Sequence, residues 1–215
     1  MFLLYIKKGL AVQVCHFYLL RHGKVEGAPA LNGYTDCNTC PDLQQKIRKA
    51  LTQKRLPFDQ IISSPLKRCA DLATLLQLDY PQATHTLNTQ IKEMSFGELD
   101  GQPFETIKGQ WPLLDAFWQD PFKNTLPDAE TLTAFHQRIH SAWNHITQTS
   151  NTNTLIITHG GVIRMILAMA LNVDWKNPVW HANLAIGNAS LTHIQISKTD
   201  QYYISVKNIA ADLLE

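Results

Sequence analysis

FYLLRHG, at residues 17–23, is the stretch of sequence that decides the fold. Its first four residues are apolar on both faces, which is typical of a central strand in a sheet covered on both sides. Arg21 and His22 follow where this strand should end. Because open α/β sheets bind ligands at the carboxyl ends of their strands, we expect a functional site here.

The rest of the chain alternates apolar runs with helical patterns, which predicts repeated βα units and a mostly parallel sheet. We predict a three-layer α/β sandwich with helices on both faces of the sheet, closed by a C-terminal hairpin. The expected strands are 15–20, 59–63, 154–158 and, more weakly, 84–87, and the hairpin strands are 189–196 and 201–207. The expected helices are 42–54, 66–78, 129–147 and 162–171.

The segment 96–127 does not follow this alternation and is rich in glycine, proline and aromatic residues. We predict a small irregular cap of short helices beside the strand ends, where it would carry substrate specificity and exclude water. A surface insertion packed on its own aromatic residues is the alternative. The predicted organisation is an N-terminal extension at 1–14 and a single domain at 15–215.

Composition excludes several classes of partner. The 215 residues are 45% hydrophobic, and 19 basic against 18 acidic side chains give no overall field that would attract nucleic acid or an anionic membrane. No apolar run is long enough to span a membrane. The four cysteines do not form a disulfide framework, which predicts a reducing compartment, by default the cytoplasm, with Cys15 and Cys69 buried.

Two further predicted strand ends carry polar motifs. SSPLKR at 63–68 places Arg68 in the first turn of a helix, and THGG at 158–161 places His159 before a helix that begins with two glycines. If the three strands are parallel neighbours, these ends bring together two imidazoles, two guanidiniums and a helix N-terminus. One guanidinium can bind two phosphate oxygens at once, and a neutral imidazole can carry a phosphoryl group. The pattern therefore predicts a phosphate pocket that contains a nucleophile.

These three motifs, together with EMSFGE at 93–98, resemble the four motifs of the histidine phosphatase superfamily, in the same order from residue 15 onward. The resemblance implies that His22 is the nucleophile that forms phosphohistidine and that His159 stabilises the phosphoryl group. Glu93 would protonate the leaving oxygen and later act as base on water. Arg21 and Arg68 would bind the phosphoryl group. Neither a metal nor a cofactor is implied.

The chain departs from the family pattern just after the first motif. Lys24 and Val25 stand where Glu-Thr is usual, and Ala28 or a neighbour takes the place of a phosphate-binding Asn. Asn32 is expected to substitute for it through a shortened loop. With Gly23 and Gly160, Asn32 completes the expected set of substrate-binding residues.

Within the superfamily, the short distance between Glu93 and His159 resembles the compact phosphatases more than the mutases. Segments 93–97 and 127–132, together with Arg138, are similar to those of the alpha-ribazole phosphatases, which remove the 5′-phosphate of alpha-ribazole phosphate in cobalamin assembly. The expected partner is therefore a small phosphorylated metabolite. A broad small-metabolite or sugar phosphatase, a phosphoglycerate mutase and a non-catalytic phosphate-binding protein are the alternatives.

Other side chains have less specific patterns. Cys37 and Cys40 form a lone CxxC, which we interpret as two free thiols in a loop. His136 and His140 lie one helical turn apart, the spacing of two zinc ligands, but without the Glu of a zinc motif we expect polar surface positions. Arg164 could reach a substrate from its helix, but we favour a salt bridge on the helix surface.

Overall fold

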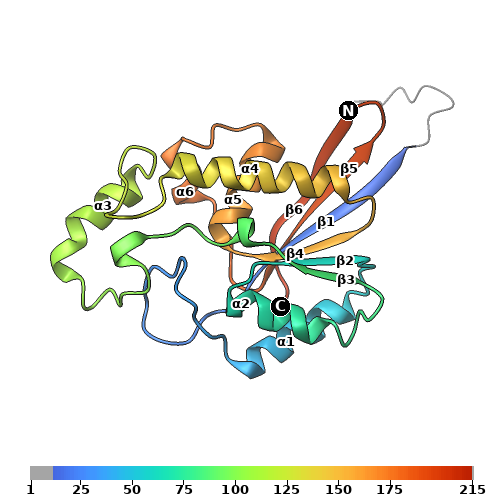
Figure 1. The fold of residues 1–215 in the computed structure, drawn as a ribbon, viewed down its shortest axis with the longest axis horizontal. Coiled ribbons are helices and arrows are strands. Elements are labelled where there is room, and N and C mark those ends of the chain that lie inside the picture. The colour runs from blue at the N-terminus through green and yellow to red at the C-terminus, as the bar shows by residue number, and fades with distance from the viewer. Residues whose placement is uncertain (1–11, 215) are drawn as a thin grey trace.

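The computed structural model describes residues 12–214, and a six-stranded sheet lies at its centre (Figure 1). The strands are β1 (Gln13–Arg21), β2 (Gln60–Ser63), β3 (Thr84–Leu87), β4 (Thr154–Thr158), β5 (Ser190–Lys198) and β6 (Tyr202–Asp212). The helices are α1 (Pro41–Gln53), α2 (Lys67–Leu76), α3 (Trp111–Gln119), α4 (Leu132–Thr149), α5 (Gly160–Leu171) and α6 (Pro178–Asn183), with short 3-10 helices η1 (Thr89–Ile91), η2 (Gly97–Leu99) and η3 (Lys108–Gln110).

The strand order is β3-β2-β4-β1-β5-β6, in which the first four strands are parallel and the last two form the antiparallel hairpin. The register aligns the carboxyl ends of the three central strands, because Arg21 pairs with Thr158 and Ser63 with Ile157. The prediction that three motif-bearing strands are parallel neighbours is therefore confirmed.

Alternation along β1 builds a core on each face of the sheet. Phe17 and Leu19 are fully buried in the cluster under α4 and α5, and the Phe17 ring meets Trp143 of α4 edge-on at 5.3 Å. Tyr18 and Leu20 belong to the cluster under α1 and α2 on the opposite face. Figure 1 shows the two groups of helices on either side of the sheet. The predicted three-layer α/β fold is confirmed.

The N-terminal boundary differs from the prediction. The expected extension ended at residue 14, but β1 already begins at Gln13, because Gln13 and Val14 pair with Lys198 and Ser197 of β5. The rest of the expected extension, residues 1–11, lies outside the described residues.

Helix boundaries differ for local reasons. The expected start of α4 at Ala129 is wrong, because Asp128 has a φ of +54° and the Thr131 hydroxyl caps the helix by accepting from the Ala134 N–H. In the other direction, α5 begins two residues early, at Gly160.

The cap region consists of η2, η3 and α3, and α3 projects on the left of Figure 1 away from the sheet. The helix α6, which the sequence analysis did not predict, packs against α3. It starts at Pro178, with Asn177 as its N-cap. Among residues 12–214, no helix has the length and apolar character needed to cross a membrane.

Candidate active site

His22 lies at the end of β1, on the wall of a cavity of about 500 Å³. Only 7% of the residue is exposed. Its Nδ1 lies 2.7 Å from the Gly23 carbonyl oxygen, so Nδ1 carries the proton and donates to that carbonyl. The other nitrogen, Nε2, is then left with a free lone pair. The local backbone therefore sets the tautomer that a nucleophilic imidazole needs.

Arg21 also lines this cavity and brings a cationic guanidinium to it. Its Nη1 donates to the Ile186 carbonyl, whereas its buried Nε has no hydrogen-bond partner among the described residues. The guanidinium lies close to Gly160: a Cβ atom added to this glycine would be 3.4 Å from Arg21 Nε. A guanidinium on the wall of a cavity is a favourable binding group for an anion such as phosphate.

Glu93 also lines the cavity, and two backbone N–H groups fix its carboxylate. Oε2 accepts from the Gly161 N–H at 3.0 Å, and Oε1 accepts from the Met94 N–H at 3.0 Å. A Cβ atom at Gly161 would lie 2.3 Å from Oε1, so this close approach requires glycine. The second glycine of the THGG motif therefore binds the carboxylate of the protein itself.

Arg138 holds the segment that carries Glu93. Its guanidinium forms a salt bridge with Glu130 at 2.7 Å and donates to the carbonyl oxygens of Gln90, Lys92 and Glu93. In the sequence, only the resemblance to the alpha-ribazole phosphatases pointed to Arg138. In the structure it is a positioning residue for the carboxylate.

Arg68 lies behind the cavity wall and is fully buried. Its Nη atoms donate to the carbonyl oxygens of Asn32, Gly33 and Thr35, and its Nε donates to His159 Nδ1 at 3.3 Å. A guanidinium has five N–H groups, so one is left for a phosphate oxygen. The structure shows Arg68 anchoring the loop that follows β1, and its contact with phosphate stays a prediction.

His159 is fully buried and meets the His22 ring edge-on at 5.2 Å between ring centroids. Because its Nδ1 accepts from Arg68, its Nε2 carries the proton and lies 2.8 Å from Ser64 Oγ. Both nitrogens are thus engaged with the protein. His159 supports one side of His22, and its direct action on a phosphoryl group stays a prediction.

The remaining predicted residues lie in and around the cavity. Gly160 and Asn32 line it, and Asn32 Oδ1 accepts from the Cys37 thiol at 3.2 Å. Gly23 is buried against Ile47 and contributes the carbonyl that orients His22. Asn188, which the sequence analysis missed, lines the cavity and donates from Nδ2 to the His22 carbonyl at 3.2 Å.

The expectation of a surface salt bridge at Arg164 is wrong. Arg164 lines the cavity and donates from Nε to the Leu184 carbonyl at 2.8 Å, and it forms no ion pair with any residue in 12–214. Its position could have been inferred from helical spacing. Arg164 comes four residues after Gly160 and three after Gly161, so it lies on the same face of the helix as these two glycines.

The cysteines are free thiols, and Cys15 and Cys69 are buried as predicted. His136 is not simply a polar surface residue, because its ring stacks on Trp175 with 4.1 Å between centroids. His140 is exposed. Within the described part of the chain, no three His, Cys, Asp or Glu side chains are grouped in a way that could hold a metal ion.

Burial keeps both active-site imidazoles neutral. It lowers the pKa of His22 to about 3, with the positive charge of Arg68 and then Arg21 acting in the same direction, while the hydrogen bond to Gly23 opposes it. Burial also holds the pKa of His159 well below its usual value, helped by the positive charge of Arg68. A neutral His22 is the form that can attack phosphorus.

We expect a pH dependence of stability from this burial. A histidine in the unfolded chain has a pKa of about 6.5. As the pH falls from 7 to 5, His22 therefore takes up a proton only in the unfolded state. The free energy of unfolding should therefore drop with falling pH, and His22→Ala should lose about 2 kcal/mol less of it over that interval than wild type. Urea denaturation at both pH values measures this. His145→Ala, which removes an exposed histidine of α4, should keep the wild-type dependence, and an equal dependence in His22→Ala would contradict the prediction.

Comparisons with known proteins agree with this geometry. The chain is 28% identical over 203 residues to a putative phosphoserine phosphatase 2 of Hydrogenobacter thermophilus, covering 87% of this chain and 94% of that protein. It is 22% identical to a broad-specificity phosphatase of Saccharomyces cerevisiae, covering 89% and 84% of the two chains.

Solved structures share the fold. Bacillus stearothermophilus YhfR superposes with a TM-score of 0.79 at 18% identity, covering 94% of this chain and all of the other. A putative alpha-ribazole-5′-P phosphatase of Escherichia coli gives 0.74 at 20% identity, covering 92% and 98%. Residues 17–209 match the sequence profile of the histidine phosphatase superfamily, branch 1, and the chain therefore belongs to this superfamily of phosphatases.

Proposed function

We propose that the protein hydrolyses small phosphomonoesters without a metal ion, through a phosphohistidine formed at His22. One observation carries the proposal: His22, whose Nε2 is free, and the guanidinium-bearing Arg21 line the same cavity. A phosphoryl group would bind the guanidinium while its phosphorus faces the imidazole. Phosphoryl transfer depends mainly on such positioning and on charge stabilisation.

The reaction has two balanced steps. In the first, His22 Nε2 forms a bond to phosphorus, the bond from phosphorus to the ester oxygen breaks, and protonated Glu93 gives its proton to the leaving oxygen. In the second, the Glu93 carboxylate takes a proton from water, the water oxygen bonds to phosphorus, and the bond from phosphorus to nitrogen breaks. Inorganic phosphate leaves and both residues return to their starting states.

Alpha-ribazole 5′-phosphate is the leading candidate substrate. The similarity of segments 93–97 and 127–132 and of Arg138 to the alpha-ribazole phosphatases supports this choice, and Arg138, paired with Glu130, holds the Glu93 segment. A broad specificity for small metabolites or sugar phosphates is the alternative. The free thiols support a reducing compartment, and we propose the cytoplasm.

The test uses the wild-type protein with 4-nitrophenyl phosphate in excess EDTA. We expect phosphate release to continue and a phosphoenzyme to be trapped that is labile in acid and stable in base. No release and no trapped intermediate would refute the proposal. A panel of alpha-ribazole phosphate, phosphoserine, 3-phosphoglycerate and sugar phosphates then identifies the substrate, and conversion of 3-phosphoglycerate to its 2-isomer would indicate a mutase instead.

A further inference from the structure

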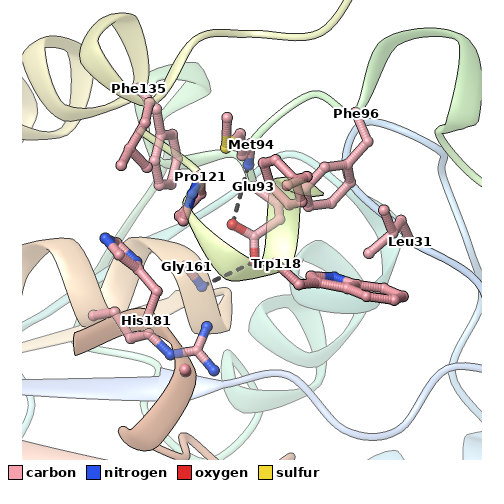
Figure 2. Close-up of a pocket in the computed structure, with 13 residues that line it drawn as sticks. Leu31, Glu93, Met94, Phe96, Trp118, Pro121, Phe135, Gly161 and His181 are labelled. Atoms are coloured by element: carbon pink, nitrogen blue, oxygen red, sulfur yellow. Dashed lines mark hydrogen bonds between the residues drawn. The ribbon is translucent and has the colours of Figure 1, made fainter. Parts of the chain in front are cut away.

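A second cavity of about 410 Å³ adjoins the first (Figure 2). The two cavities share part of their walls, including Glu93, Gly161 and Arg164. Figure 2 shows the Glu93 carboxylate among the side chains of this second cavity, with Phe96 and Trp118 to one side and Phe135 and His181 to the other. The carboxylate that would protonate a leaving oxygen therefore faces both spaces.

The direction of the bond that breaks assigns a role to the second cavity. His22 lines only the first cavity and attacks phosphorus from there, so the bond that breaks points away from His22. The leaving oxygen must come within hydrogen-bond reach of Glu93. The group attached to that oxygen then continues beyond Glu93, into the second cavity.

The walls of the second cavity are mainly aromatic and apolar. Phe117 and Trp118 come from α3 in the cap, Phe135 from α4, and Phe96 from the segment after Glu93. Phe96 and Phe117 meet edge-on with 6.0 Å between ring centroids. Flat rings pack favourably against such aromatic walls, whereas a small polar group would leave them unfilled.

Polar contacts in this cavity are few and specific. His181 Nε2 lies 2.7 Å from the Trp175 carbonyl and donates to it, and burial lowers the pKa of His181, so its Nδ1 is left as an acceptor. Arg164 uses its Nε for the Leu184 carbonyl, and its other N–H groups have no acceptor among residues 12–214. Among residues 12–214, Glu93 is the one carboxylate on the wall, and the proposed reaction uses it as acid and base.

From these observations we infer that the second cavity is the leaving-group site, and that it selects phosphomonoesters whose alcohol carries an uncharged planar ring. Trp118 and Phe117 pack on the ring, and Arg164 and His181 bind polar atoms near it. The inference rests on the proposed function and adds the class of substrate and the residues that select it.

The test compares two esters of primary alcohols, 2-naphthylmethyl phosphate and n-propyl phosphate, whose leaving oxygens are similar in basicity. We expect kcat/KM to be roughly 10- to 100-fold higher for the ring-bearing ester. Trp118→Ala, at a residue that is 39% exposed and so tolerates truncation, should reduce this preference by roughly 10-fold, through a loss of kcat/KM for the ring-bearing ester. Leu113→Ala, on the same helix but on neither cavity wall, is the matched control and should keep the full preference.

Other outcomes separate this inference from the proposed function. Equal kcat/KM values for the two esters, or a preference for phosphoserine with its carboxylate on Arg164, would overturn the ring site while the phosphatase activity stands. If no ester is turned over, the proposed function fails, and calorimetric titration with the two corresponding phosphonates decides the ring site alone. Tighter binding of the naphthylmethyl phosphonate that depends on Trp118 supports the site, and equal Kd values refute it.

Discussion

Replacing His22 by alanine is expected to lower phosphate release by roughly 10⁴-fold or more, because no other imidazole among residues 12–214 lines the first cavity. His159 cannot take its place, since both of its nitrogens are bound to Arg68 and Ser64. Steady-state release from 4-nitrophenyl phosphate measures the loss. Trapping in base should show no phosphoenzyme in the variant.

The control for this experiment is His145→Ala on the exposed face of α4, which should keep wild-type turnover and phosphoenzyme. Circular dichroism of both variants shows whether the fold is kept. If a folded His22→Ala retained more than a few percent of the activity, His22 would not be the nucleophile.

Replacing Glu93 by glutamine is expected to affect the two chemical steps unequally. Glutamine keeps the size of the side chain, although its NH2 group cannot accept from one of the two backbone N–H groups that Glu93 binds. Because it can neither give nor take the proton, turnover of alkyl phosphates should fall by roughly 10²- to 10⁴-fold. A nitrophenolate leaves without an acid, so 4-nitrophenyl phosphate should still phosphorylate His22. Attack by water then becomes the slow step, and the phosphoenzyme should accumulate.

Stopped-flow release of nitrophenolate from the Glu93→Gln variant should thus show one rapid equivalent per protein, followed by slow turnover. Glu98→Gln changes an exposed carboxylate five residues along the chain and should behave like wild type. The absence of a rapid phase, with 4-nitrophenyl and alkyl phosphates slowed to the same degree, would contradict the role of Glu93 as both acid and base.

The strand ends could be predicted from the sequence because each combines an apolar run with polar residues that packing does not require. The register of β1, β4 and β2 confirms that inference. The partners of Arg68 could not be predicted, because every residue has a backbone carbonyl oxygen and the sequence does not show which of them will accept a hydrogen bond. Their direction depends on how the loop folds, and Asp100 helps to set it by accepting from the Gly33, Tyr34 and Thr35 N–H groups.

The second cavity also could not be predicted from the sequence. Its walls come from α3, α4, α6 and the segment around Phe96, which are far apart along the chain and meet only in the folded state. The sequence suggested a cap rich in aromatic residues. It did not indicate which of the rings face the active site and which pack on each other, as Trp111 does on Phe104.

The anchoring of the loop by Arg68 has a consequence for how this protein can vary. Arg68 binds the loop through the main-chain oxygens of Asn32, Gly33 and Thr35, which every amino acid possesses. The attachment is therefore indifferent to side-chain identity at Asn32 and Thr35. Substitutions at these two positions should therefore leave the attachment of the loop to Arg68 in place.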